Sequence, residues 1–485
     1  MGFRVALALG VALMHRFRVM LVPMASAVLT FGVVPGAVGQ VDPGCLRHDV
    51  VPVAVVGKPM SFSVDVLSET RTFTLGGSWP GFGSAVVTHD VTADGCLDLL
   101  VGAPASNQVH LITGSPTGPG TGPSAIIQFA GKAGDAFGTS IAAERVPATG
   151  MTPERLRVWV GAPGADVGGV VDAGAVVYYT VSSDLRVSAP RVFTQNSPGV
   201  PGDAERGDRF GQVLAPLRSG VAVGVPGEDV GTKVDAGALW VLPAPAASPV
   251  GPGPYAVSQD SPGIPGGAEP GDAFAAALDM NRWFEGLDPV PGGESGLWVG
   301  VPGEDVGSLR DAGLVHQLKV GKTAATSLLV RTQDSPGVAG AAERGDRFGS
   351  SLLGGPGDFD DDEQCHGTAV MIGVPGEDLG SVVDAGAVNV GDGVGTTGCP
   401  VKSREWIMHL GTLARAGDRL GASLGFGGVG APGGDVGSAI DAGFVVSSVY
   451  SPYKVWTEHP AFAGNRFGSV LAKEAYDPGP PLIQN

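Results

Sequence analysis

One acidic segment has the residue types and spacing of a cation-binding loop. Its oxygen ligands would be Asp90, Thr92, Asp94, the backbone carbonyl of Cys96, and Asp98, at positions one, three, five, seven and nine. Gly95 permits the sharp turn that gathers them. Ca²⁺ takes roughly six to eight oxygen ligands from carboxylates and carbonyls. The segment therefore predicts a Ca²⁺ site, and an acidic turn without metal is the alternative.

A second segment is a poorer copy of this pattern. Asp358, Asp360 and Asp362 repeat the first three acidic positions, but Glu363 replaces the turn glycine and His366 replaces the last carboxylate. We predict a weaker Ca²⁺ candidate here, with a solvated acidic loop as the alternative.

Five pairs of aspartates, each six residues apart, form a third acidic pattern. The pairs are Asp166 with Asp172, Asp229 with Asp235, Asp305 with Asp311, Asp378 with Asp384, and Asp435 with Asp441. One interpretation is a ring of acids that collects cations or a basic ligand. We favour a structural role, in which each Asp closes its own turn through side-chain-to-backbone hydrogen bonds, because a binding site rarely needs five equal copies.

The sequence offers no catalytic constellation. The eight histidines are scattered, without an H-x-x-x-H pair, and no Gly-x-Ser-x-Gly segment lies between a strand and a helix. We therefore predict no catalytic residues and no cofactor other than Ca²⁺.

The elements that must position these residues repeat along the chain. Phe-Gly or a variant begins each repeat, at Phe82, Phe137, Phe210, Phe274, Phe348, Leu420 and Phe467. Gly-[Ala/Val]-Pro follows each anchor but the last, beginning at Gly102, Gly161, Gly224, Gly300, Gly373 and Gly430. Such a period indicates stacked supersecondary units. The 80 glycines and 39 prolines are then expected to form the turns between short Val-rich strands.

Four short strands in each unit predict an all-β fold, a seven-bladed β-propeller of four-stranded antiparallel blades. The six intervals from Phe82 to Phe467 cover 385 residues, so seven units need about 449 residues. Residues 40–485 supply 446 of them, which predicts one propeller domain. The last repeat has only a first strand, so we expect residues 45–75 to complete the seventh blade and close the ring.

The N-terminal segment and the charge indicate an exported protein. Arg4, Arg16 and Arg18 precede or flank an apolar run that ends in small residues before Gln40, which predicts a signal peptide over residues 1–39. An uncleaved membrane anchor is the alternative. The net charge of −18 becomes −21 without those arginines, which disfavours nucleic acid and anionic membranes as partners.

These motifs resemble FG-GAP repeats, the blade motif of the integrin α-subunit head propeller and of many exported bacterial proteins. The resemblance covers residues 40–485 and implies seven blades, calcium loops between first and second strands, and ligand binding on one face. Thr92 departs from the usual Asp or Asn of such loops, which removes one charge and predicts weaker affinity.

Four cysteines in an exported chain suggest two disulfides, and the sequence alone allows three connectivities. Cys365 and Cys399 fall in loops on the same face of the fifth repeat. Cys45 and Cys96 both precede second strands of adjacent blades. We predict the disulfides Cys45–Cys96 and Cys365–Cys399.

The leading functional hypothesis is a secreted or cell-surface binding protein. We expect a calcium-stabilised monomer that recognises an extracellular protein or glycan through the loops of one face, without catalysis and without membrane insertion after signal cleavage. The alternatives are a polysaccharide lyase or hydrolase that uses the central pocket, and a purely structural surface protein.

Overall fold

The structure is a computed structural model of the chain. It describes residues 54–67, 72–115, 118–120, 122–148, 153–218, 220–245, 253–280, 295–358, 366–393, 406–425, 427–447, 454–458 and 460–474. These residues belong to one compact unit, Pro43–Asn485. The predicted signal peptide lies outside the described residues.

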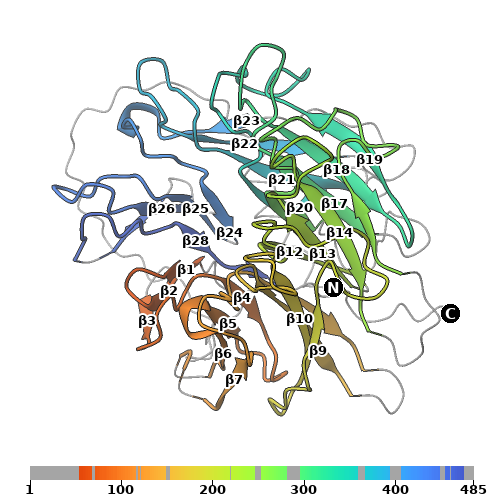
Figure 1. Ribbon diagram of the computed structural model, residues 1–485. Helices are drawn as coiled ribbons and strands as arrows, with labels where there is room; N and C mark the ends of the chain where they lie inside the picture. Colours follow the sequence, from red (N-terminus) through yellow and green to blue (C-terminus); the bar gives the residue numbers. More distant parts are fainter. Residues whose placement is uncertain are drawn as a thin grey trace, which may run out of the picture. The chain divides into compact units, whose positions relative to one another are not determined.

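Seven antiparallel sheets are arranged in a ring around a central axis (Figure 1). The first strands are β4 (Val86–His89), β8 (Ile141–Val146), β12 (Val213–Leu217), β16 (Ala277–Met280), β20 (Ser351–Asp358), β24 (Ser423–Gly425) and β28 (Val470–Leu471). First strands of neighbouring blades contact one another and line the central cavity. The predicted seven-bladed propeller is therefore confirmed.

The other strands follow outward in chain order. The second strands are β5 (Asp98–Ala103), β9 (Arg155–Ala162), β13 (Gly220–Val225), β17 (Ser295–Val301), β21 (His366–Val374), β25 (Gly428–Ala431) and β1 (Ala54–Lys58). The third strands are β6 (Gln108–Ile112), β10 (Ala175–Ser182), β14 (Ala238–Pro243), β18 (Leu314–Val320), β22 (Ala387–Asp392), β26 (Phe444–Ser447) and β2 (Ser63–Leu67). The fourth strands are β7 (Ser124–Gln128), β11 (Arg191–Phe193), β15 (Tyr255–Val257), β19 (Ala325–Arg331), β23 (Trp406–Met408), β27 (Val455–Thr457) and β3 (Thr72–Gly76).

Burial explains why the middle strands read as continuous apolar runs. Every residue of β13 is buried, whereas the outer strand β11 is mostly exposed. The hydrophobic clusters lie between neighbouring blades; one of them joins Leu100 of β5 to Val158 of β9. Both faces of a middle strand are therefore covered by other blades, which favours β-branched residues on both sides.

The repeated glycines mark the closest contact between blades. A Cβ on Gly102 would lie 2.0 Å from the carbonyl oxygen of Gly138 in the next blade, and the same approach recurs around the ring. It includes the closing interface, where a Cβ on Gly57 would lie 2.0 Å from the oxygen of Gly83. Only glycine permits the backbones to approach this closely, so the two sequence motifs meet across each interface.

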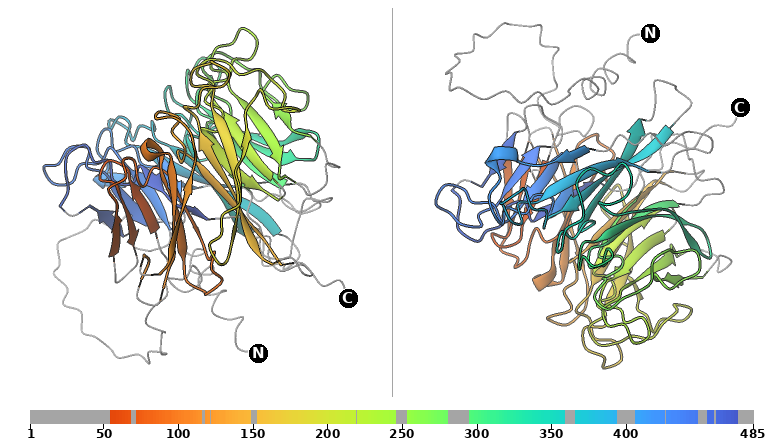
Figure 2. Two further views of the ribbon diagram at one scale, coloured as in Figure 1. Left: turned by 60° about the horizontal axis from the view of Figure 1, so that its bottom comes forward. Right: turned by 90° about the horizontal axis from the view of Figure 1, so that it is seen from above.

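Both ends of the chain close the ring, as predicted. In the seventh blade β1 pairs with β28, through Val56 with Leu471 and Gly57 with Val470. The first and last parts of the propeller consequently lie side by side in both views of Figure 2.

One detail differs from the prediction of four-stranded blades. The chain beyond β28 forms β29 (Lys473–Glu474), which pairs in parallel with β4 and makes the first sheet five-stranded. The inner edge of β4 offers free backbone groups, and the departing chain satisfies some of them.

Helical structure in the described residues is limited to two 3₁₀ turns, η1 (Pro104–Ser106) and η2 (Gly411–Leu413). Among those residues, we find no helix with both the length and the apolar character that membrane crossing requires.

Candidate functional site

The predicted calcium loop connects β4 to β5. The Asp90 carboxylate accepts backbone hydrogen bonds from Asp94 (3.1 Å) and Gly95 (2.8 Å), and Asp94 Oδ1 accepts one from the Cys96 N–H (2.8 Å). Ala93 and Gly95 have positive φ values of 59° and 83°. The loop is therefore tightly folded by its own carboxylates, with Asp94 exposed and Asp90 half-buried.

Asp98, the first residue of β5, is fully buried and engaged in hydrogen bonds. Its Oδ2 accepts bonds from the N–H groups of Val91 (2.8 Å) and Thr92 (3.0 Å) and from Thr92 Oγ1 (3.3 Å), and its Oδ1 accepts one from the Gly114 N–H (2.7 Å). Burial raises the pKa of Asp98, although the bonds from Gly114, Thr92 and Val91 oppose this. These four donors occupy the lone-pair sites of the carboxylate, so Asp98 holds the β4–β5 loop against the segment that follows β6.

This geometry fits a cation for part of the predicted ligand set. The carboxylates of Asp90 and Asp94, the Thr92 hydroxyl oxygen and the Cys96 carbonyl would hold Ca²⁺, which would supply charge neutralisation and stiffening of the loop. Asp98 would have to exchange hydrogen bonds for a metal bond, and its ligand role stays a prediction. Within the described residues, no three His, Cys, Asp or Glu side chains are already gathered in a metal-binding arrangement.

Much of the remaining predicted set falls on residues that are not described. Asp358 ends β20 and pairs with His366, whereas Asp360 and Asp362 lie outside the described residues. Cys96 is buried, and Cys45, Cys365 and Cys399 lie outside the described range. The weaker Ca²⁺ candidate and both disulfides therefore stay predictions.

The aspartate pairs have the structural role that we favoured. In every pair the first Asp accepts, through Oδ1, the backbone N–H of the second, over 2.9 to 3.3 Å. The second Asp of each pair has a φ near 50°. Its backbone carbonyl accepts a hydrogen bond from the backbone N–H of the residue just before the Phe-Gly motif of the next blade, as Asp172 does from Arg209. The pairs fold the loop between the second and third strands and attach it to the neighbouring blade.

The loops that join successive blades lie on the same face as these turns. In three of them a Ser hydroxyl caps the start of the loop, as Ser197 does for the Thr194 N–H (2.9 Å), and a side-chain oxygen holds its end, as Asn196 does for the Ala204 N–H (3.1 Å). The equivalent bonds link Ser258 with Ser261, Asp260 with Ala268, Thr332 with Ser335, and Asp334 with Ala342. An ion pair from Lys233 to Asp260 (2.7 Å) connects the two kinds of loop.

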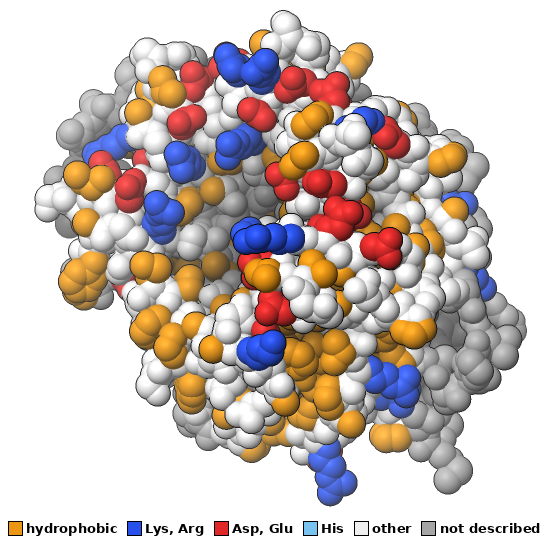
Figure 3. All heavy atoms as spheres, in the orientation of Figure 1, with side chains coloured by type: hydrophobic (Ala, Val, Ile, Leu, Met, Phe, Trp, Pro, Cys, Tyr) orange, Lys and Arg blue, Asp and Glu red, His pale blue; other side chains and the backbone are white. Residues whose placement is uncertain are grey.

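Exposed aliphatic side chains stand at the tips of the turns between second and third strands. Val171, Val234, Val383 and Ile440 are 43%, 55%, 54% and 66% exposed, each just before the second Asp of a pair. In Figure 3, charged side chains of both signs gather around the hollow in the middle of the face shown.

Three clusters of buried and half-buried carboxyl groups were not anticipated from the sequence. Gln195 Nε2 donates to Glu228 (2.8 Å), Gln259 to Glu304 (2.6 Å) and Gln333 to Glu377 (2.6 Å). An aspartate of the Gly-Asp-x-Phe motif lies beside each glutamate, namely Asp208, Asp272 or Asp346, and each is at most 2% exposed. The recurring Thr/Ser-Gln and Pro-Gly-Glu-Asp segments were the available signal.

Burial has a large effect on these acids. It raises the pKa of Glu228 to about 8, with the Asp208 charge adding to it and the Gln195 hydrogen bond opposing it. Burial likewise raises the pKa values of Asp272 and Asp346 to about 7, with contributions from Glu304 and Glu377. Both carboxyl groups of a cluster are therefore costly to ionise together without a counter-charge.

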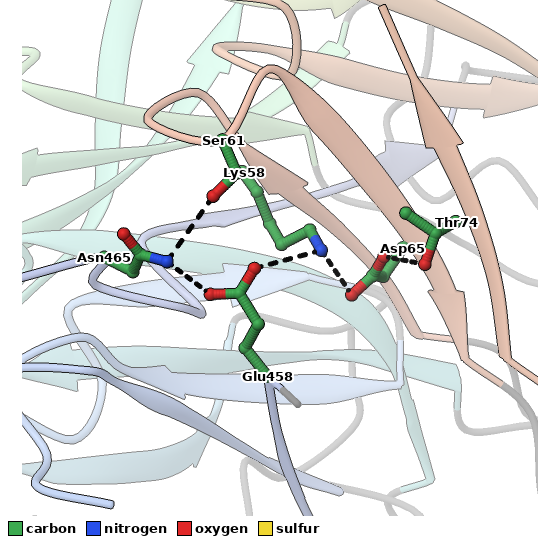
Figure 4. A network of polar contacts seen from close by, with 6 residues as sticks. All are labelled: Lys58, Ser61, Asp65, Thr74, Glu458 and Asn465. Carbon is green, nitrogen blue, oxygen red and sulfur yellow. Dashed lines mark hydrogen bonds and ion pairs between the residues drawn. The ribbon is translucent and has the colours of Figure 1, made fainter. Parts of the chain in front are cut away.

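The seventh blade has a different arrangement at the corresponding place (Figure 4). Glu458 and Asn465 replace the Gln and Asp, and Asn465 Nδ2 donates to Glu458 (2.6 Å). Lys58 Nζ lies between Glu458 (3.3 Å) and Asp65 (2.9 Å), and Thr74 donates to Asp65 (2.7 Å). An ammonium group here neutralises the acids.

A cavity of about 290 Å³ lies where the first strands converge. Its polar lining is mainly hydroxyls that follow the Phe-Gly motifs, such as Ser84, Ser350 and Ser469. Lys473 Nζ reaches across it from β29 to the carbonyls of Leu278 (2.8 Å) and Leu352 (3.3 Å). No His, Tyr or Arg is among the residues that line the cavity in the described part of the chain.

Known proteins resemble this chain in motif and in fold. Residues 82–127 match the model of the FG-GAP repeat. No curated protein matches the sequence. Among solved structures, a Bacteroides fragilis protein provisionally named a 6-phosphogluconolactonase is 9% identical, with 87% of this chain and 98% of that chain covered and a TM-score of 0.43. Aleuria aurantia lectin in complex with alpha-methyl-L-fucoside is 10% identical, with 77% and 97% covered and a TM-score of 0.34.

The family match and the blade count agree with the expectation drawn from the repeated motifs. The chain is thus a seven-bladed β-propeller that carries an FG-GAP repeat.

Proposed function

We propose that this protein is an exported, calcium-binding monomer that recognises an extracellular protein or glycan through the loops of one propeller face, without catalysis. Export is supported by the signal-like first 39 residues. The binding role is supported by the form of the loops between second and third strands and between blades. We expect the secreted chain to begin near Gln40, which mass spectrometry of the secreted protein would check.

The repeated aliphatic tips are the observation that carries the binding role. Val171, Val234, Val383 and Ile440 are presented by turns whose backbones are fixed by Asp–Asp hydrogen bonds. A rigid loop loses little conformational entropy when it binds, so exposed apolar groups on such loops favour association. Their recurrence in separate blades suits an extended or repetitive partner.

The calcium site acts at a distance from this face. Because strands alternate in direction, the loop from Asp90 to Asp98 lies at the opposite end of its blade from the turns between second and third strands. Calcium would therefore stabilise the scaffold rather than contact the partner, and its removal would weaken binding only as far as it loosens the propeller.

Glycan and protein arrays probed with the secreted protein would test the proposal. We expect binding to a defined ligand set that falls at least tenfold in the triple variant Val234→Ser, Val383→Ser, Ile440→Ser. The matched control is Val192→Ser with Val455→Ser, which removes aliphatic groups of comparable exposure from the outer strands (46% and 49% exposed). Equal loss in the control variant, or no ligand on either array, would refute recognition through this face.

The central cavity is where the alternative activity on polysaccharides would reside. It contains Lys473 and several serines, but the ammonium group of Lys473 is bonded to backbone carbonyls. Release of reducing ends or unsaturated products from a polysaccharide panel, abolished by Lys473→Met, would favour that alternative over a pure binding role.

A further inference from the structure

The three buried clusters share one unexplained feature. The Oε1 atoms of Gln195, Gln259 and Gln333 are buried and accept no hydrogen bond, although the amide nitrogen of each donates to the neighbouring Glu. The three glutamines are only 1–2% exposed. A buried unsatisfied oxygen is rare in native structures, and three equivalent ones indicate a missing partner.

Each orphaned oxygen is on an amide whose nitrogen contacts a glutamate, so turning that amide by about 180° would add the oxygen to a set of hard oxygen ligands. In the first cluster the Gln195 amide nitrogen donates to Glu228 (2.8 Å), and the same amide lies close enough to Asp208 to lower the pKa of that carboxyl group. In the third cluster Asp346 Oδ1 is also buried without a partner. Two carboxylates and one amide oxygen are the ligand types that Ca²⁺ takes.

The surroundings leave the negative charge uncompensated. The charged groups that influence Glu228 are Asp208, Glu205 and Asp229, all acidic. The second and third clusters repeat this with the acids around Asp272 and Asp346. Glu228 and Glu304 are only half-buried, so an ion can enter from the loop face, where the fully buried Asp and Gln would form the floor of the site.

Other blades provide an internal comparison. In the seventh blade, where Glu458 replaces the Gln and Asn465 the Asp, the Lys58 ammonium reaches this position and neutralises Glu458. In the second and sixth blades Ala165 and Gly434 stand where the cluster glutamate would be. These six blades thus either carry their own cation at this place, lack one acid, or retain a complete set of oxygens; the first blade, with Pro80 and Ser106 at the two acidic positions, lacks both acids.

We propose that each complete cluster binds one Ca²⁺, held by the carboxylates of Asp208 and Glu228, Asp272 and Glu304, or Asp346 and Glu377, and by the amide oxygen of Gln195, Gln259 or Gln333. The amide turns its oxygen to the metal, an exchange of the oxygen and nitrogen positions that leaves the rest of the glutamine side chain in place. These sites bridge the loop between blades and the next blade, and they are separate from the Asp90 loop. The proposal does not depend on the identity of the partner.

Calcium stoichiometry is the decisive measurement. The protein is freed of divalent ions by chelation and titrated with Ca²⁺ by calorimetry, in an Asp94→Ala background that removes the first-repeat loop from the count. We expect Glu228→Gln, Glu304→Gln and Glu377→Gln each to lower the number of bound ions by one. The matched controls are Glu205→Gln and Glu269→Gln, which remove exposed acids next to the clusters and should leave the number unchanged.

A second measurement does not depend on variants of the ligands. The Trp240 ring lies beside the first cluster, because a Cβ on Gly202 would lie 3.3 Å from Trp240 Cζ2 and 3.9 Å from Gln195 Nε2. Bound Tb³⁺ should therefore give luminescence excited through Trp240, displaced by Ca²⁺ and reduced at least twofold in Trp240→Phe. Equal stoichiometry in the parent and the triple Glu→Gln variant, or Tb³⁺ emission insensitive to Trp240→Phe, would overturn the proposal and leave shared protons as the way these acids are neutralised.

Discussion

Lys473 provides the sharpest test of how the ring is held closed. It lies on β29, which connects the last blade to the first, and its Nζ crosses the central cavity to the carbonyls of Leu278 and Leu352. The same ammonium lies 3.6 Å from Asp279 Oδ1, whose side chain is 2% exposed and whose Oδ2 accepts the Gly354 N–H (2.7 Å). Lys473→Met keeps the aliphatic stem and removes the charge.

The expected loss follows from this geometry. Two unit charges 3.6 Å apart attract by about 4–5 kcal/mol at an effective dielectric constant of about 20. The Lys473 side chain is 35% exposed, so water screens part of this attraction. The hydration that the ammonium group loses on folding offsets a further part of it. Removing it also leaves Asp279 buried without its counter-charge. We expect a loss of about 2–4 kcal/mol in the free energy of unfolding, within the range for breaking a buried pair.

Urea unfolding followed by tryptophan fluorescence and far-UV circular dichroism would measure this loss. For a chain of 485 residues the unfolding entropy is about 1 kcal/mol/K, so the Tm should fall by about 2–4 °C. Lys132→Met is the control, because its ammonium is 79% exposed and lies 4.0 Å from Asp166. It should cost less than about 0.5 kcal/mol. The reasoning would be refuted by a Lys473→Met variant that is as stable as the Lys132→Met control.

Four further substitutions test the loops and the buried acids. Asp98→Ala should lower the free energy of unfolding by about 3 kcal/mol even in chelator, because it leaves the buried N–H groups of Val91 and Gly114 without an acceptor. Asp94→Ala should lower calcium uptake while lowering the free energy of unfolding by less than about 1 kcal/mol. Equal stability losses in the two variants would contradict this. Glu144 pairs with Arg157 at 2.9 Å, and burial raises its pKa from 4.5 to about 7. Between these two pH values the folded protein holds a proton that the unfolded chain has lost. The contribution of Glu144 to stability should therefore fall by up to about 3 kcal/mol as the pH rises from about 4.5 to 7. Urea titrations of Glu144→Gln should therefore show a flatter pH dependence than the parent, and parallel curves would refute it. Asp229→Ala should destabilise the folded protein by about 1 kcal/mol, because the Asp235 N–H loses the hydrogen bond that it donates to Asp229 (2.9 Å). An unchanged Tm in thermal unfolding would show that the backbone alone stabilises this turn.

The candidate site could be anticipated only in part. The Asp90 loop was visible because all its members lie within nine residues, so spacing alone indicates their convergence. The clusters around Glu228, Glu304 and Glu377 were missed because their members come from two blades and from segments up to 45 residues apart. Their burial, rather than their sequence, makes these acids unusual.

The sequence by itself determined the number of blades, the strand order within each blade and the closure of the ring. The reason is local: each Phe-Gly and Gly-[Ala/Val]-Pro pair encodes one interface at which two backbones approach too closely for any side chain. Only the tertiary structure decided where charge is buried. It placed Asp98 among four donors, Lys473 across the cavity and three carboxyl pairs between blades, because desolvation depends on what the rest of the ring packs against each group.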